Sequence, residues 1–166
     1  MQVSARVTVT PFNLDLPSTL DTFIGMGFHS VGFSPLLRAS NGRAEMGPGD
    51  MADMLQGMIA CGLAFEQKVM RGERYPFSNM QNALREIQRG THRPYPCGAG
   101  AGYFGVSADG ELAACHHEVL ARGRSACDYI RGWLHYVIGA HGRLARYAPA
   151  WFAGPPDTPS NGTGVA

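Results

Sequence analysis

The front of the chain alternates between strand-like and helix-like patterns of hydrophobic positions. Residues 3–10 place an apolar side chain at every second position before Pro11, which is typical of a β-strand. The apolar positions of 16–26 share one stripe, and Gly27 suits the end of a helix, so this segment is predicted to be helical. Residues 29–34 predict a second strand. Strand, helix and strand form a βαβ unit, which predicts parallel pairing of the two strands.

Helical periodicity dominates the following part of the chain. A glycine-rich loop over 38–49 occupies the position after a strand where α/β barrels place binding loops. A long helix is predicted from Asp50 to about Met70, and a shorter one over 78–89. A third helix is predicted over 129–145, although three glycines weaken this prediction: Gly132, Gly139 and Gly142. The predicted fold class is α/β.

In segment 94–119 the helical periodicity of the preceding residues gives way to short apolar runs around a turn. Two short apolar runs flank 107–110, and the Asp-Gly pair that ends this turn is a strong signal for a β-hairpin. Cys97 and Cys115 bracket the hairpin. Because a hairpin brings its two ends together, two thiolates distant in sequence would face one metal ion or iron–sulfur cluster.

The amino-acid sequence around these cysteines resembles that of a known protein family. Cys97 followed by Gly110-x4-Cys115 is similar to the first half of the SPASM motif of radical S-adenosylmethionine (radical SAM) maturases. The flanking sequences look like those of anaerobic sulfatase maturases and, more closely, of quinohemoprotein amine dehydrogenase maturases: PCGAG, VSADG and ACH. Upstream, 5–10 and 27–35 resemble two late strands of the partial (β/α)6 radical SAM barrel.

This resemblance implies a site and a division of the chain. Cys97 and Cys115 would be ligands of an auxiliary [4Fe–4S] cluster beside a peptide or protein substrate, as in intact relatives. Arg6 and Thr8 would lie at the mouth of the barrel, near S-adenosyl-L-methionine. The implied parts are a partial radical SAM barrel over 1–93, a SPASM-like cysteine hairpin over 94–119, a divergent helical segment over 120–154 and a disordered tail over 155–166.

The departures from the family limit the expected activity. Cys-x3-Cys-x2-Cys, which holds the radical-generating cluster in the family, does not occur in this sequence. The chain alone is therefore not expected to generate a radical. The later SPASM cysteines are also absent, and the resemblance ends near Glu118. The sequence beyond it is rich in Arg, Gly and Ala, and a shifted reading frame is one hypothesis for its origin.

Other residues leave a second interpretation open. Cys97, Cys115 and one of His116 or His117 would suit zinc, which accepts mixed sulfur and nitrogen ligands. Such a site would make the chain a non-catalytic zinc-binding or protein-interaction module. Two further cysteines are assigned no chemistry, one as a buried hydrophobe and one as a free thiol: Cys61 and Cys127. Several later arginines are predicted to form a solvated face: Arg122, Arg124, Arg131, Arg143 and Arg146.

Charge and composition narrow the partners. The chain has 14 basic and 13 acidic side chains, so no net field would concentrate nucleic acid or an anionic membrane around it. Neither an export signal nor a long apolar run is recognisable, which predicts a cytoplasmic protein with reduced thiols. A few βα units cut from a barrel would leave strand edges open, so a partner chain or self-association is expected.

Overall fold

The computed structural model describes residues 2–39, 41–90, 104–106, 109–113 and 123–153. Its first three elements are strand β1 (Ser4–Val9), helix α1 (Leu16–Gly25) and strand β2 (Ser30–Pro35). The strands pair in parallel, in a register that runs from Ser4 opposite Ser30 to Val9 opposite Pro35. The βαβ unit predicted from the sequence is thereby confirmed.

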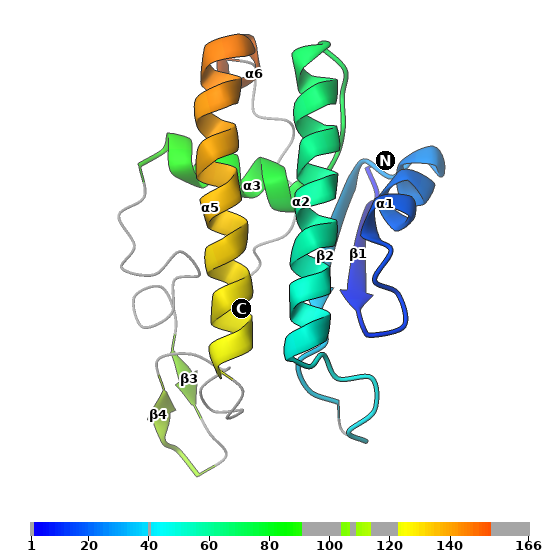
Figure 1. The fold of residues 1–166 in the computed structure, drawn as a ribbon, viewed down its shortest axis with the longest axis vertical. Coiled ribbons are helices and arrows are strands. Elements are labelled where there is room, and N and C mark those ends of the chain that lie inside the picture. Colours follow the sequence, from blue (N-terminus) through cyan, green and yellow to red (C-terminus); the bar gives the residue numbers. More distant parts are fainter. Residues whose placement is uncertain (1, 40, 91–103, 107–108, 114–122, 154–166) are drawn as a thin grey trace.

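Helices form most of the remaining described chain. They are α2 (Pro48–Met70), α3 (Ser78–Gln88), α5 (Gly123–Tyr147) and the short α6 (Ala150–Ala153). Figure 1 shows α2 and α5 side by side and running in the same direction, with α3 crossing behind them and the β1–β2 sheet beyond α2. Mixed helix and strand is thus the observed fold class, in agreement with the α/β prediction.

The start of α2 differs from the prediction by one half-turn. The helix begins at Pro48, whose fixed φ suits the first helical position, and Gly47 is its N-cap. Asp50, where the helix was predicted to begin, is instead the third helical residue, and its Oδ2 accepts a hydrogen bond of 2.8 Å from the Gly47 amide. A carboxylate at this position also interacts favourably with the positive end of the helix dipole.

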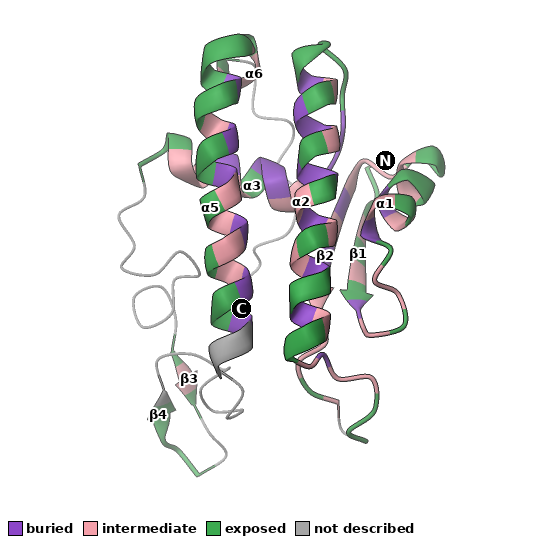
Figure 2. Cartoon of the chain, viewed as in Figure 1, coloured by how far each residue is buried: buried purple, intermediate pink, exposed green. Residues whose placement is uncertain are grey.

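The hydrophobic core lies between the sheet and the long helices. Alternate residues of β1 and β2 point into it, which accounts for the two-residue period of the sequence. In Figure 2 the buried parts of α5 lie on the side turned toward α2. The largest fully buried side chains among the described residues come from both halves of the chain: Val9, Leu16, Leu20, Val31, Met54, Met58, Phe65, Phe77, Met80, Leu84, Val137 and Leu144.

Helix α5 extends beyond the predicted 129–145 at both ends. Its contacts with α2 show why glycine is tolerated at this interface. A Cβ atom at Gly132 would lie 2.5 Å from Cδ2 of Leu55. Across the same interface, a Cβ at Gly62 would collide with the ring of Tyr136. Glycine at these positions lets the two helices approach closely, which offsets its low helix propensity.

The outer edge of β2 is closed by the chain that precedes and begins α3. The Val31 amide donates to the Pro76 carbonyl at 2.9 Å, as in a short parallel pairing. Two residues further along β2, at Phe33, the side-chain amide of Asn79 makes the hydrogen bonds that a neighbouring strand would otherwise make. Its Oδ1 accepts from the Phe33 amide at 2.8 Å, and its Nδ2 donates to the Phe33 carbonyl at 3.0 Å.

A small hairpin completes the described structure. Strands β3 (Gly105–Val106) and β4 (Leu112–Ala113) pair antiparallel, and Gly110 adopts a φ of 83° in the connection. This backbone conformation favours glycine, so the predicted Asp-Gly reversal is confirmed. The predicted tail over 155–166 lies outside the described residues.

Candidate functional site

Arg6 and Thr8, the predicted cofactor-binding residues, lie on the exposed face of β1. Their side chains point away from the core, whereas Ala5, Val7 and Val9 point toward it. The Arg6 Nε donates a hydrogen bond of 3.2 Å to Oγ of Ser34 on β2. The sheet therefore presents a cationic side chain, oriented by a neighbouring hydroxyl, on the face opposite the core.

This exposed face is polar along both strands. Register places Ser4 beside Ser30, Arg6 beside Gly32 and Thr8 beside Ser34, so side chains of these residues share one face. Parallel sheets are usually covered on both faces. A polar second face suits contact with a polar ligand or water better than contact with another hydrophobic layer.

The start of α3 limits how far this polar strip extends. A Cβ atom at Gly32 would lie 2.5 Å from Oγ of Ser78, and that hydroxyl donates to the Val31 carbonyl at 3.0 Å. Glycine is therefore needed where α3 begins beside β2. The open part of the strip lies over β1, around Arg6.

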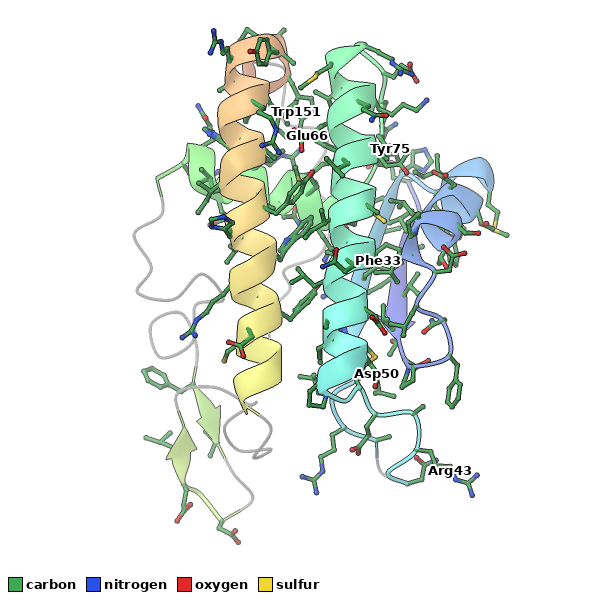
Figure 3. The ribbon with its side chains drawn as sticks, viewed as in Figure 1. Phe33, Arg43, Asp50, Glu66, Tyr75 and Trp151 are labelled. Atoms are coloured by element: carbon green, nitrogen blue, oxygen red, sulfur yellow. The ribbon has the colours of Figure 1, made fainter. Side chains whose placement is uncertain are left out.

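The carboxyl ends of β1 and β2 lead into two ordered turns. The Thr10 amide and hydroxyl both donate to Oδ1 of Asn13, at 2.6 and 2.9 Å. Beyond β2, the Ala39 amide donates to Oε1 of Glu45 at 3.0 Å, and Ala44 adopts a φ of 61°, which costs energy for a residue with a Cβ. Figure 3 shows Arg43 extending from this second loop, near the beginning of α2.

The hairpin lies at the same end of the molecule as these turns in Figure 1. One of its faces is apolar and exposed, with relative exposures of 64% for Phe104, 66% for Val106 and 77% for Leu112. The proposed ligands Cys97 and Cys115 and the alternative ligands His116 and His117 lie outside the described residues. The predicted metal centre therefore remains a prediction.

Neither a metal centre nor a membrane helix is found in the described part of the chain. No three or more His, Cys, Asp or Glu side chains gather there in a way that could hold a metal ion. Its helices are all too short or too polar to cross a bilayer.

A partly buried ionic cluster joins α2 and α5, and no pattern in the sequence predicted it; its carboxylate is buried, whereas the Arg143 side chain is 46% exposed. Glu66, only 4% exposed, accepts two hydrogen bonds from Arg143: Nε to Oε2 at 2.8 Å and Nη2 to Oε1 at 2.9 Å. The Tyr136 hydroxyl also donates to Oε1. The guanidinium of Arg143 is thus not simply part of a solvated face, which corrects the prediction for this residue.

The chemistry of this cluster is that of a structural clamp. Burial and the hydrogen bond to Glu66 raise the pKa of the Tyr136 hydroxyl well above its usual range. The hydrogen bonds to Glu66 raise the pKa of Arg143, so it stays charged. A permanently charged arginine and a tyrosine that resists ionisation are poor proton carriers at neutral pH. Figure 3 shows Glu66 between the two helices, away from the loops at the carboxyl ends of the strands.

Cys61 is unsuited to metal or redox chemistry. Its side chain is fully buried on α2, as predicted. Desolvation, assisted by the negative charge of Asp21, raises the pKa of the Cys61 thiol to about 12. A thiol rather than a thiolate is therefore present at neutral pH. Cys127, in contrast, is exposed on α5.

No family model, curated protein or solved structure matches this chain. The two features that carry chemistry are the polar face around Arg6 and the hairpin that the cysteines flank in sequence.

Proposed function

We propose that this chain is a fragment or degenerate member of the radical SAM/SPASM maturases, which modify peptide or protein substrates. Cys97 and Cys115 are its auxiliary-cluster ligands, and 1–93 corresponds to the last βα units of a partial (β/α)6 barrel. The observation that carries the proposal is the tight reversal at Gly110, between the two cysteines in sequence.

The reversal sets a condition for cluster binding. Cys115 follows Ala113 by two positions, whereas Cys97 precedes Gly105 by eight. The two sulfur atoms can meet only if the extra residues, which include the glycine-rich 98–102, turn back toward the hairpin. Glycine allows such a tight path close to an inorganic centre.

The polar face of the β1–β2 sheet supports the barrel part of the proposal. In a barrel the face opposite the helices lines the lumen, and a cationic residue on that face would bind the carboxylate of S-adenosylmethionine. Arg6 has this position, and Thr8 lies next to it on the same face. In intact relatives S-adenosylmethionine supplies the radical. This chain lacks Cys-x3-Cys-x2-Cys, so the proposal gives it a binding role and no radical step of its own.

Zinc binding by Cys97, Cys115 and His116 or His117 is the second candidate. It is favoured by the ligand count, because Cys61 is sealed in the core and cannot serve as a further thiolate. A [4Fe–4S] cluster usually requires four thiolates, whereas a zinc site accepts two cysteines with histidine. Both candidates require reduced thiols, which persist in the cytoplasm, and we propose that compartment for the protein.

Metal analysis of the full chain after anaerobic purification tests the proposal. We expect brown protein with broad visible absorption, stoichiometric iron and acid-labile sulfide, and loss of all three in Cys97→Ala and in Cys115→Ala. Cys127→Ala is the matched control, because it removes an exposed thiol outside the proposed ligand pair. Colourless protein that carries one zinc supports the second candidate. Protein that binds neither metal contradicts both.

A further inference from the structure

The outer edge of β1 carries a row of backbone groups that face away from β2. The Val9 carbonyl accepts from the Leu36 amide at 2.8 Å, so the backbone of Val9 faces β2. Successive residues of a strand direct their backbone groups to opposite sides. The amides of Ser4, Arg6 and Thr8 therefore point outward, with the carbonyls of the same residues.

Among the described residues this edge is open, whereas the opposite edge of the sheet is closed. Asn79 and Pro76 satisfy the outer edge of β2, as described above. On β1 the Thr8 carbonyl accepts from Nδ2 of Asn13 at 3.0 Å, at the end of the strand. In the described part of the chain β1 pairs with β2 alone. Open edges of this kind are templates for a further strand.

We propose that the outer edge of β1 binds an extended segment of a partner protein by strand addition, and that this segment carries an acidic side chain beside Arg6. The two faces of β1 define the rest of the pattern. Exposed Arg6 lies on the polar face, whereas half-buried Ala5 and Val7 lie on the other. A complementary strand would alternate acidic or polar residues with small apolar ones. This inference does not rest on the proposed maturase function.

The charge of Arg6 argues against a second copy of the chain as the occupant. Two β1 strands paired antiparallel about their centre would place Arg6 opposite Arg6, and like charges at such positions are destabilising. Sliding the pair toward the carboxyl end of β1 is opposed by Asn13, which already occupies the Thr8 carbonyl. An acidic segment from another protein avoids the like-charge pair, and it can pair with Ser4 and Arg6 and end before the occupied Thr8 carbonyl.

Fluorescence anisotropy with two labelled peptides tests the charge preference. The probes are acetyl-TVEVTVEVT and acetyl-TVKVTVKVT, titrated with the full chain at low ionic strength. We expect the glutamate peptide to bind about threefold or more tightly than the lysine peptide, as a surface ion pair allows. Arg6→Glu should reverse this order, a change that loss of folding cannot produce. Equal binding of both peptides, or no binding, overturns the proposal.

Proline variants test the backbone contacts. Ser4→Pro removes an outward amide and leaves the pairing with β2 intact, so peptide affinity should fall about tenfold without loss of cooperative melting. Ala5→Pro is the matched control, because it removes an inward amide and should lower the melting temperature instead. Light scattering identifies the occupant: a dimer that Ser4→Pro converts to monomer would assign the edge to a second copy and overturn the proposal. Metal content in Ser4→Pro should stay that of the parent chain, which separates this test from that of the maturase function.

Discussion

At the scale of single residues, Glu66 determines how α2 and α5 meet. Its carboxylate is almost fully buried, and a bidentate arginine and a tyrosine hydroxyl from α5 satisfy it. A buried carboxylate without partners would be costly, so the three groups depend on one another. The ring of Tyr136 also lies 5.9 Å from the Arg143 guanidinium carbon, which adds a cation–π contact.

Replacing this carboxylate should destabilise the fold. In Glu66→Gln the side chain keeps its size but loses its charge, and Arg143 is left without its anionic partner. We expect the free energy of unfolding, measured by urea denaturation at pH 7, to fall by about 1–3 kcal/mol. Glu73→Gln is the matched control. It removes an exposed ion pair with Lys68, which solvent screens, and should cost much less than Glu66→Gln. Equal losses in the two variants would show that Glu66 is not a clamp.

The sequence could predict the role of a residue where that role depends on its neighbours along the chain. The burial of Cys61 followed from its neighbours on a helical stripe, and the Asp-Gly reversal followed from turn chemistry. The pairing of Glu66 with Arg143 did not, because 77 positions separate them and no local pattern links them. The strand-like role of Asn79 was hidden for the same reason: its partner on β2 is 46 positions away.

At the scale of elements, most of the helices and strands were recognisable from hydrophobic periodicity. The prediction was weakest for α5, because its glycines lower helix propensity. Packing against α2 outweighs that cost, and a propensity argument cannot foresee it. The apolar stripe of α5 contributes Trp133, Val137 and Leu144 to the common core. If this segment came from a shifted reading frame, there would be no physical reason for its apolar stripe to fit the core formed by the rest of the chain.

Two glycine substitutions should have opposite effects on this helix pair. Gly62→Ala would push a methyl group into the ring of Tyr136, which Glu66 holds in place, and should destabilise the fold by about 1–3 kcal/mol. Gly142→Ala adds a methyl group at an exposed position of α5, with no atom within 4 Å. It should stabilise the fold by about 0.5–1 kcal/mol. Chemical denaturation measures both. The same sign for the two variants would contradict this account of the interface.

At the scale of the whole molecule, buried phenols predict alkaline instability. Burial raises the pKa of Tyr75, Tyr129 and Tyr136 above the ordinary value of 10.0. The unfolded chain therefore loses these protons first, and stability that is present below pH 10 is lost as the pH rises further. We expect the unfolding free energy to fall by up to about 1.4 kcal/mol per pH unit for the deeply buried Tyr129, and by less for Tyr75 and Tyr136, where solvent screens the charge. Denaturation between pH 8 and about pH 11.5 measures the slope, and Tyr129→Phe should make it shallower. An unchanged slope in that variant would exclude Tyr129 as a source.

For the candidate site, the sequence could predict only the face of the sheet on which residues lie, and a cofactor-binding role for Arg6 and Thr8 remains a prediction. Strand alternation alone places Arg6 and Thr8 on one face, and the structure has them there. Whether Cys97 and Cys115 meet depends on segments outside the described residues, so their pairing remains a prediction. Periodicity also could not reveal that the start of α3 covers the face of β2 near Gly32.

The alternating backbone of β1 has a consequence for amide hydrogen exchange. Along this one strand, odd-numbered amides are tied to β2 and even-numbered amides face solvent. In deuterated water the protection factors should therefore rise and fall with a two-residue period: slow at Ala5, Val7 and Val9, and fast at Ser4, Arg6 and Thr8. Nuclear magnetic resonance resolves each amide separately. Uniform protection along the strand would mean that a neighbour already shields its outer side.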